Sequence, residues 1–311
     1  MIEIKKLEDT PLAIPAAEFE RILLPFIRRD AGSGDARWRK AVARRSRRLS
    51  QNLWRRRLLG FLPRFRRNES EIEREYAEVW DGVGFENYRV SPPPTDGAPW
   101  EWRGRHWIVS RFGSARLKLL LTMRAIELCQ PASVLEIGSG NGVNLLYLAG
   151  RFPGIRFAGL ELTAQGVAAA RGFQAAHERF PAENAAFSPL PLIDDTAFRR
   201  VEFTQGSAQR LPFADGSFDM AMTVLALEQM ESIRADALRE TPRAARRNVL
   251  MIEPFADLNR TGLHRRYIAS RDYLRAGLAD LRGYGLEPLW ATADFPQKAV
   301  MVATCVLAEK R

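Results

Sequence analysis

Between residues 133 and 180, short apolar runs alternate with longer segments whose apolar side chains recur at helical spacing. The short runs predict buried strands, and the 3.6-residue spacing predicts helices between them. Such alternation is typical of α/β proteins with a mostly parallel sheet and right-handed crossovers. The predicted segments are strands at 133–137 and 156–160 and helices at 144–151 and 165–180.

The strand pattern resumes after an insertion at 181–197 that is rich in Pro, Ala and Phe, and that we expect to fold over a site at the sheet. Apolar runs at 220–225 and 248–252 predict two further strands. The last two runs, at 286–293 and 299–307, are joined by a short polar connection. They predict an antiparallel pair at the edge of the sheet.

The first third of the chain is helical and polar in pattern. Residues 37–67 place apolar side chains four or seven apart among arginines, which predicts a basic amphipathic helix ending near Pro63. Residues 69–80 predict an acidic helix, a candidate electrostatic partner for the basic one. Residues 112–129 predict a long helix that leads into the first strand of the sheet.

Charge is concentrated in one part of the chain. The net charge is +10, and residues 28–67 contain 15 Arg or Lys against two acids, so this segment carries +13 and the rest −3. The two cysteines, Cys129 and Cys305, do not suggest a disulfide framework and fit a reducing cytoplasm. No secretory signal is expected at 1–10, and no apolar run is long enough to span a bilayer.

The basic segment leaves three interpretations open. It is a solvated extension, a helix on an anionic membrane surface, or a site for RNA or another polyanion. The Trp and Leu content of 37–67 favours the membrane, because binding to phosphates does not require an apolar face. If the basic segment is a helix at the membrane interface, deleting residues 1–67 is expected to leave a folded core.

A glycine-rich loop follows the first predicted strand of the sheet. Gly138, Gly140 and Gly142 alternate with other residues, so the backbone can turn sharply and approach a ligand closely. The loop lacks the Gly-Lys-Ser/Thr of a phosphate loop, and its third glycine comes one residue early for a dinucleotide fingerprint. Glu136, just before the loop, would repel phosphates but could face a cationic ligand.

Two further motifs follow at the ends of the next strands. Glu161 ends the second strand, where an acidic side chain can accept hydrogen bonds from ribose hydroxyls. A third element runs through 203–208, and the stretch 211–219 leads into the strand at 220–225.

Together these motifs resemble the class I S-adenosylmethionine (SAM)-dependent methyltransferases, in the type 11 group around the quinone C-methyltransferases. The resemblance covers residues 116–310 and implies a Rossmann-like, mostly parallel seven-stranded sheet with a reversed edge strand. It implies that Glu136–Gly142 holds the methionine end of SAM, Glu161 the ribose, and Ser207 with Ala208 the adenine. Ser207 departs from the family, which usually has Asp there. The predicted cofactor-binding residues are Glu136, Gly138, Ser139, Gly140, Gly142, Glu161, Leu162, Ser207, Ala208 and Thr223.

Methyl transfer needs alignment more than a strong catalytic group, because the leaving group is already activated. His264 is a candidate base, or a surface histidine, and Glu228 a candidate acceptor contact or a structural residue. Glu253 is expected to satisfy a turn. The dispersed histidines predict no metal site.

The sequence therefore predicts a basic, helical N-terminal extension and lid at 1–110 and a methyltransferase domain at 111–311. We expect a small-molecule, lipid or lipid-linked acceptor, handled in the cytoplasm at the inner face of the membrane, with a homo-oligomer left open. The alternatives are an RNA methyltransferase that uses the basic segment and a SAM-binding protein without catalysis.

Overall fold

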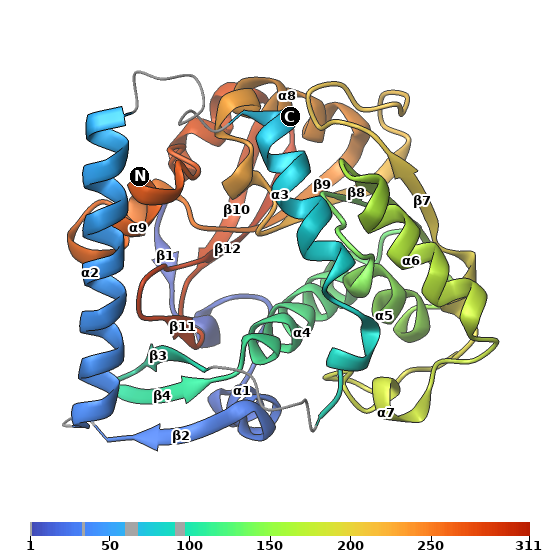
Figure 1. The fold of residues 1–311 in the computed structure, drawn as a ribbon. Coiled ribbons are helices and arrows are strands. Elements are labelled where there is room, and N and C mark those ends of the chain that lie inside the picture. Colours follow the sequence, from blue (N-terminus) through green and yellow to red (C-terminus); the bar gives the residue numbers. More distant parts are fainter. Residues whose placement is uncertain (1, 33–34, 60–67, 91–96) are drawn as a thin grey trace.

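The computed structural model describes residues 2–32, 35–59, 68–90 and 97–311. Its main sheet has the strand order β1-β10-β12-β9-β8-β5-β6-β7 (Figure 1). The predicted α/β fold with a mostly parallel sheet is confirmed. The strands are β1 (Ile4–Lys5), β10 (Leu286–Thr292), β12 (Thr304–Lys310), β9 (Ala245–Glu253), β8 (Phe218–Val224), β5 (Ser133–Ile137), β6 (Arg156–Glu161) and β7 (Glu202–Gln205).

Two details of the sheet differ from the seven-stranded prediction with a reversed edge strand. The short strand β1 adds to β10 in parallel and makes an eighth strand. The reversed strand is β12, which lies inside the sheet, antiparallel to both β9 and β10. The inner place suits β12 because its residues from Thr304 to Ala308 are all buried, whereas β10 leaves Leu289 49% exposed. Cross-strand pairing on both sides satisfies such a strand's backbone groups.

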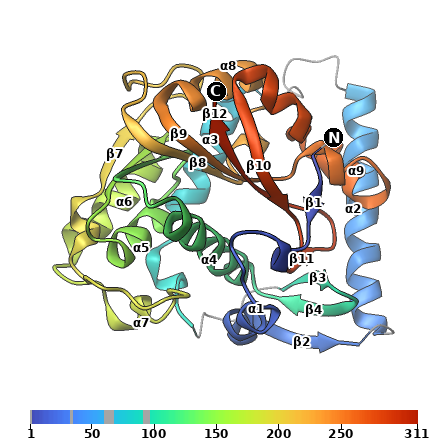
Figure 2. The same ribbon diagram turned by 180° about the vertical axis from the view of Figure 1, so that it is seen from behind.

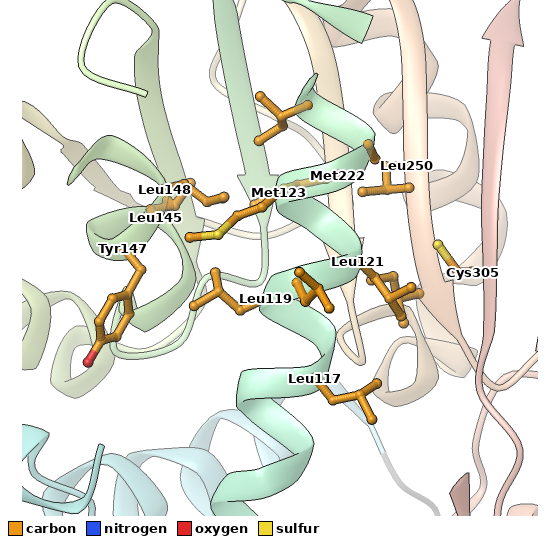
Figure 3. Close-up of a cluster of buried hydrophobic side chains, with 14 of the residues drawn as sticks. Leu117, Leu119, Leu121, Met123, Leu145, Tyr147, Leu148, Met222, Leu250 and Cys305 are labelled. Carbon is orange, nitrogen blue, oxygen red and sulfur yellow. The ribbon is translucent and has the colours of Figure 1, made fainter. Parts of the chain in front are cut away.

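Helices cover both faces of the main sheet. The helices α4 (Arg111–Cys129), α5 (Val143–Arg151) and α6 (Ala164–Ala176) share one apolar core with the sheet, and α8 (Arg234–Ala244) with the 3₁₀ helix η9 (Leu278–Tyr284) shares the other. The central helix α4 is buried along most of its length, between the sheet and the helices packed on it. Figure 3 shows its side chains projecting toward α5 on one side and toward β9 and β12 on the other.

A second, four-stranded sheet lies beside the first, in the order β11-β3-β4-β2. Its strands are β11 (Gln297–Lys298), β3 (Ala98–Trp102), β4 (Arg105–Val109) and β2 (Ile27–Ala31). Because β11 pairs with β3, this sheet joins residues from both sides of the predicted boundary at 110. The division into 1–110 and 111–311 remains a prediction.

Residues 7–26 form part of the main core, so deleting 1–67 would expose apolar surface of that core. The expectation that a core without 1–67 stays folded remains a prediction. The helix α1 (Ala16–Leu23) packs on α4, and Phe19, Ile22 and Phe26 are fully buried in the same core as α5. The buried residues of α1, Phe19, Ile22 and Leu23, lie on one side of the helix, and α4 covers that side.

The basic helix α2 (Ala36–Leu59) lies along one side of the molecule, next to α9 (Gly262–Arg271) in both Figure 1 and Figure 2. Leu49 is buried there in a cluster with Tyr267 and Met301. At the other end, Trp38 Nε1 donates to the carbonyl of Trp100 over 3.3 Å. The apolar face of α2 is therefore partly used for packing within the protein. Its expected end near Pro63 lies outside the described residues.

The acidic helix α3 (Glu69–Asp81) does not pack on α2 but on α6, on the same side of the sheet. The side chain of Asn68 caps its first turn by accepting from the backbone N–H of Glu71 over 2.9 Å. None of the described helices is both long enough and apolar enough to cross a membrane. The remaining short helices are α7 (Ala182–Ala185), η1 (Leu7–Asp9), η2 (Leu24–Phe26), η4 (Phe85–Asn87), η5 (Ala197–Arg200), η6 (Leu227–Gln229), η7 (Glu231–Ile233) and η8 (Ala256–Leu258).

Candidate functional site

A pocket of about 350 Å³ opens at the carboxyl ends of β5, β6 and β8. Ligands of open α/β sheets bind at this end, outside the strand ends. The glycine-rich loop, the ends of the neighbouring strands and the first half of α4 form its walls, and α3 lies across it. Eight of the predicted site residues line this pocket: Glu136, Gly138, Ser139, Gly140, Glu161, Leu162, Ala208 and Glu228.

The loop needs glycine at the two positions nearest the pocket. Gly138 and Gly140 have φ values of 75° and 56°, which side chains with a Cβ rarely adopt. A Cβ on Gly138 would lie 2.5 Å from the Cβ of Ala226, and one on Gly140 would lie 2.4 Å from the ring of Trp80. The backbone is therefore bare where a ligand approaches the loop.

Glu161 links the loop to the second strand. Its Oε2 accepts from the Gly140 N–H over 2.9 Å, and its Oε1 accepts from the N–H and the hydroxyl of Thr163 over 3.0 and 2.7 Å. The side chain is 6% exposed and lines the pocket. A carboxylate has about four acceptor positions, so one position, on Oε2, remains for a hydroxyl group of a ligand.

Glu136 is fully enclosed beneath the loop. Its Oε1 accepts from Asn144 Nδ2 over 2.6 Å, while its buried Oε2 and the hydroxyl of Ser139 have no hydrogen-bond partner among the described residues. Burial, and to a smaller extent the charge of Glu161, raises the pKa of Glu136 to about 8. Unpartnered buried polar atoms are rare in folded proteins, so these two fit a polar, cationic ligand in the pocket.

Other predicted cofactor residues shape the site without lining it. Gly142 begins α5 with φ 76°, and a Cβ there would lie 2.6 Å from Phe203. The Ser207 hydroxyl donates to Glu69 of α3. Ser207 itself does not line the pocket, but the residues on either side of it in the chain, Gly206 and Ala208, do. Thr223 is fully buried inside β8, one residue short of the lining residue Val224.

The helix α3 forms the outer wall of the pocket. Ile72, Tyr76 and Trp80 follow one another at spacings of four, so they share one face of α3, and all three line the pocket. The acidic residues between them obscured this stripe in the sequence pattern. The spacing of four was the signal that could have shown α3 to be the lid.

The insertion at 181–197, expected to be the lid, packs elsewhere. Asn184 Nδ2 donates to the carbonyls of Phe85 and Tyr88 over 2.7 and 3.1 Å, and Phe187 is fully buried against Tyr88. None of its described residues lines the pocket. Its aromatic side chains contribute to the main core. This packing explains the composition rich in Pro, Ala and Phe from which we predicted a lid.

The wall formed by α4 is polar and basic at the pocket end. Arg111, Ser114 and Lys118 line the pocket there, joined by Lys298 of β11. Lys118 Nζ donates to the Ser114 carbonyl over 2.9 Å and to its hydroxyl. Burial lowers the pKa of Lys118 to about 7, and the charge of Lys298 adds to this shift. The sequence signal was a lysine on an otherwise apolar helix face.

Of the two candidate catalytic residues, Glu228 lies at the pocket and His264 does not. Glu228 is 6% exposed, and its Oε1 accepts from Gln229 Nε2 over 2.8 Å. His264 lies on α9, which packs against α2, and is not among the lining residues. Glu253 accepts backbone N–H groups of Ala226, Leu227 and Glu228 over 2.9 to 3.1 Å, so it fixes the turn after β8.

Carboxylates of the insertion have partners of their own. Asp194 accepts from the N–H and hydroxyl of Thr196, and Asp195 pairs with Arg179 over 3.0 Å. In the part of the chain that the structure describes, no three His, Cys, Asp or Glu side chains gather as metal ligands would.

Comparisons with known proteins agree with this site. Residues 135–252 match the type 11 family model described as "Methyltransferase domain", which spans the loop, Glu161 and the strands around the pocket. No curated protein matches the chain.

Among solved structures, the (4+2)-cyclase SpnF is 17% identical with a TM-score of 0.50, covering 77% of this chain and 94% of its own. The geranyl diphosphate C-methyltransferase from Streptomyces coelicolor A3(2) is 13% identical with a TM-score of 0.48, covering 77% and 98%. The YcgJ protein from Bacillus subtilis is 19% identical with a TM-score of 0.44, covering 62% and 97%.

The cyclase shows the shared fold, and the family match falls on the residues that build the pocket. The unpartnered Glu136 and Ser139 atoms and the bare loop fit SAM, which carries a cationic sulfonium and an ammonium group. Residues 135–252 therefore carry a methyltransferase domain of the class I fold, an enzyme domain whose cofactor is SAM.

Proposed function

We propose that the enzyme methylates a small-molecule or lipid acceptor, which binds beneath α3 in the pocket that also holds SAM. The observation that carries this proposal is the position of α3. Ile72, Tyr76 and Trp80 cover the pocket, and Trp80 lies against Gly140 of the loop. An acceptor beneath such a lid is small or presents a narrow end, and this favours a small molecule over a folded RNA.

In this proposal each wall of the pocket has its own role. Glu136 and the loop through Gly142 hold the methionine end of SAM, and Glu161 accepts from the ribose hydroxyls. When bound, SAM supplies a methyl group on a good leaving group. The chain's own task is to align the acceptor in line with that methyl and to exclude water, with α3 as the cover. Glu228 is the acidic side chain placed to contact the acceptor.

Incubation with SAM carrying a labelled methyl group tests the proposed acceptor class. We expect label in small-molecule or lipid extracts of the source cells, and none in their RNA. Label in RNA alone would support the RNA methyltransferase instead. Unchanged SAM with every extract, despite tight SAM binding, would support a SAM-binding protein without catalysis.

The raised pKa of Glu136 predicts that SAM binding depends on pH. Below pH 8 the buried carboxyl is mostly protonated, and a bound cation favours its ionised form, so binding releases a proton. We expect SAM affinity to rise between about pH 6 and 8 and to level off above. Calorimetry in two buffers of different ionisation enthalpy measures the proton release. A Glu136→Gln variant should lose the pH dependence of SAM affinity. If the variant keeps the same pH profile, the dependence comes from titration of the ligand and not of Glu136.

We further propose that α2 brings the enzyme to an anionic membrane surface. Trp54 and Leu58, near the C-terminal end of α2, are 65% and 63% exposed, whereas Leu49 is buried against α9. Arg44, Arg47 and Arg48 are exposed on the same helix. Exposed apolar side chains beside arginines are typical of helices that lie in a membrane interface.

Replacing Trp54 and Leu58 with Ser is expected to weaken binding to anionic liposomes, because it removes apolar burial worth about 25 cal/mol per Å² and keeps the charge. Cosedimentation measures this. A matched control is Leu289→Ser, which changes an exposed leucine on β10. Binding that ignores the Trp54 and Leu58 replacements but falls steeply with salt, and that RNA competes away, would contradict the membrane proposal and favour a polyanion.

A further inference from the structure

One end of the pocket carries basic side chains without carboxylate partners. Arg111, Ser114, Ala115 and Lys118 of α4 are spaced as one helix face and all line the pocket, and Lys298 of β11 faces them. Among the described residues, some partly buried cations pair with acids, as Arg124 does with Glu18 over 2.9 Å, and others donate to carbonyl groups, as Arg116 does to Ile22 over 3.1 Å. A cluster of cations in a pocket therefore needs its own explanation.

The contacts of Lys118 and Lys298 include no direct carboxylate partner among the described residues. Lys118 donates to the two oxygens of Ser114, and no hydrogen bond or ion pair joins Lys118 or Lys298 to a carboxylate among the described residues. The acids nearest Lys118 are Glu228 and Glu253. Glu253 accepts from three backbone N–H groups and Glu228 accepts from Gln229, and the charges of both carboxylates raise the pKa of Lys118 against the effect of burial.

The opposite wall of the pocket has the opposite character. Glu136 and Glu161 lie at the ends of β5 and β6, where the loop meets the strands. The pocket is thus acidic beside the glycine loop and basic beside α4 and β11. A cationic cofactor fits the first end, and a group of negative charge fits the second.

We propose that the basic end binds an anionic group of the methyl acceptor, a carboxylate or a phosphate, through Lys118 and Lys298, with Arg111 at the exposed rim. This inference rests on the proposed function, since it places the acceptor in the same pocket as SAM. Lysine ammonium groups bind such anions by charge-assisted hydrogen bonds. The acceptor is then anchored by its charged end while its nucleophilic atom points toward the loop.

The proposal has a consequence for protons. The groups that face Lys118 are Lys298 from β11, Glu228 from η6, Glu253 from β9 and, on its own helix, Arg111. An anion beside Lys118 favours the charged form of the amine, whose pKa is about 7 in the unliganded pocket. Binding therefore takes up a proton near and above pH 7, and affinity for the anion falls as the pH rises through this range. This sign is opposite to that expected for SAM and Glu136.

A second explanation assigns the same lysines to the carboxylate of SAM itself. The two explanations differ in which ligand the lysines serve. S-adenosylhomocysteine (SAH) has this carboxylate, and 5′-methylthioadenosine lacks it. A lysine that holds the cofactor's carboxylate contributes to SAH binding and not to methylthioadenosine binding. A lysine that holds the acceptor contributes to neither.

The test is calorimetric titration of the SAH-saturated enzyme with inorganic phosphate and, separately, with benzoate, at equal ionic strength. We expect saturable binding of at least one probe, and which one binds separates phosphate from carboxylate acceptors. Lys298→Met and Lys118→Met should each weaken that binding about tenfold or more, as loss of a charge-assisted bond implies. Lys6→Met, an exposed lysine on the N-terminal segment, should not. Titration in two buffers at pH 8 should show proton uptake in the wild type and not in Lys118→Met.

Three results would overturn the proposal. One is that neither probe binds the SAH complex. Another is that both lysine variants bind the probe as the wild type does. The last is that Lys298→Met weakens SAH but not methylthioadenosine, which assigns the lysines to the cofactor. If SAH itself fails to bind the wild type, the proposed function has failed before this inference is reached. Lys298→Met keeps the test open if Lys118→Met does not fold.

Discussion

Replacing Glu161 with Ala is expected to weaken SAM binding by roughly 2–4 kcal/mol, because the charge-assisted hydrogen bonding to the ribose is lost. The structure adds a second reason. Glu161 also accepts from the Gly140 N–H and from Thr163, so the alanine variant releases the loop that approaches the ligand. Calorimetry with SAM and with SAH measures the loss. Equal affinity in variant and wild type would contradict the assignment of the ribose to this carboxylate.

A matched control separates the local effect from a general effect of charge. Glu202→Ala removes a carboxylate from the start of the neighbouring strand β7, where the side chain is exposed and far along the strand from the pocket end. We expect its SAM affinity to equal that of the wild type. Tight binding of NAD that competes with SAM would point instead to a dinucleotide site at the same strand ends.

Phe19→Ala is expected to destabilise the whole protein by about 3–5 kcal/mol, as is usual for a fully buried phenylalanine. Phe19 of α1 lies 5.9 Å from Trp102 of β3 and 6.5 Å from Phe295, measured between ring centroids. It therefore ties the N-terminal helix to the second sheet and to the segment before β11. Urea unfolding followed by circular dichroism measures the change in free energy.

The control for this prediction comes from the same stretch of chain. Leu24→Ala changes a side chain that is 68% exposed, and we expect it to alter stability by less than about 0.5 kcal/mol. If Phe19→Ala unfolds at the same urea concentration as the wild type, the helix α1 contributes little to the core, as the expectation of a folded core without residues 1–67 requires.

The part of the site that could be predicted from sequence is the part made by neighbouring residues. Gly138, Gly140 and Glu161 lie at the ends of consecutive parallel strands, so their spacing along the chain already implies that they meet. A parallel sheet fixes where such ends lie. This local rule explains why the sequence alone predicts that the loop and Glu161 lie together.

The remaining walls come from distant segments, which no local rule brings together. Tyr76 and Trp80 line the pocket because α3 packs on α6. Lys298 lines it because β11 pairs with β3. The insertion at 181–197 was taken for the lid because its aromatic residues had no evident core to join. That core includes Phe187 and is completed by Phe26 and Tyr88, which lie far earlier in the chain.

The basic segment shows the same limit. Its helical pattern and arginines were correctly identified, and α2 forms where the pattern begins, with the Asp35 carboxylate accepting from the N–H groups of Arg37 and Trp38. The pattern could not show that Leu49 would be covered by α9, since that contact joins residues more than 200 positions apart. Among the described residues of this segment, the exposed Trp54 and Leu58 remain for a membrane.

The most direct test of the central claim is a crystal structure of the enzyme with SAH bound. We predict the ribose hydroxyls within hydrogen-bond distance of Glu161, the amino group of the homocysteine near Glu136 and Ser139, and α3 closed over the ligand with Trp80 against the loop. A nucleoside bound elsewhere, or in this pocket with its ribose turned away from Glu161, would contradict the account.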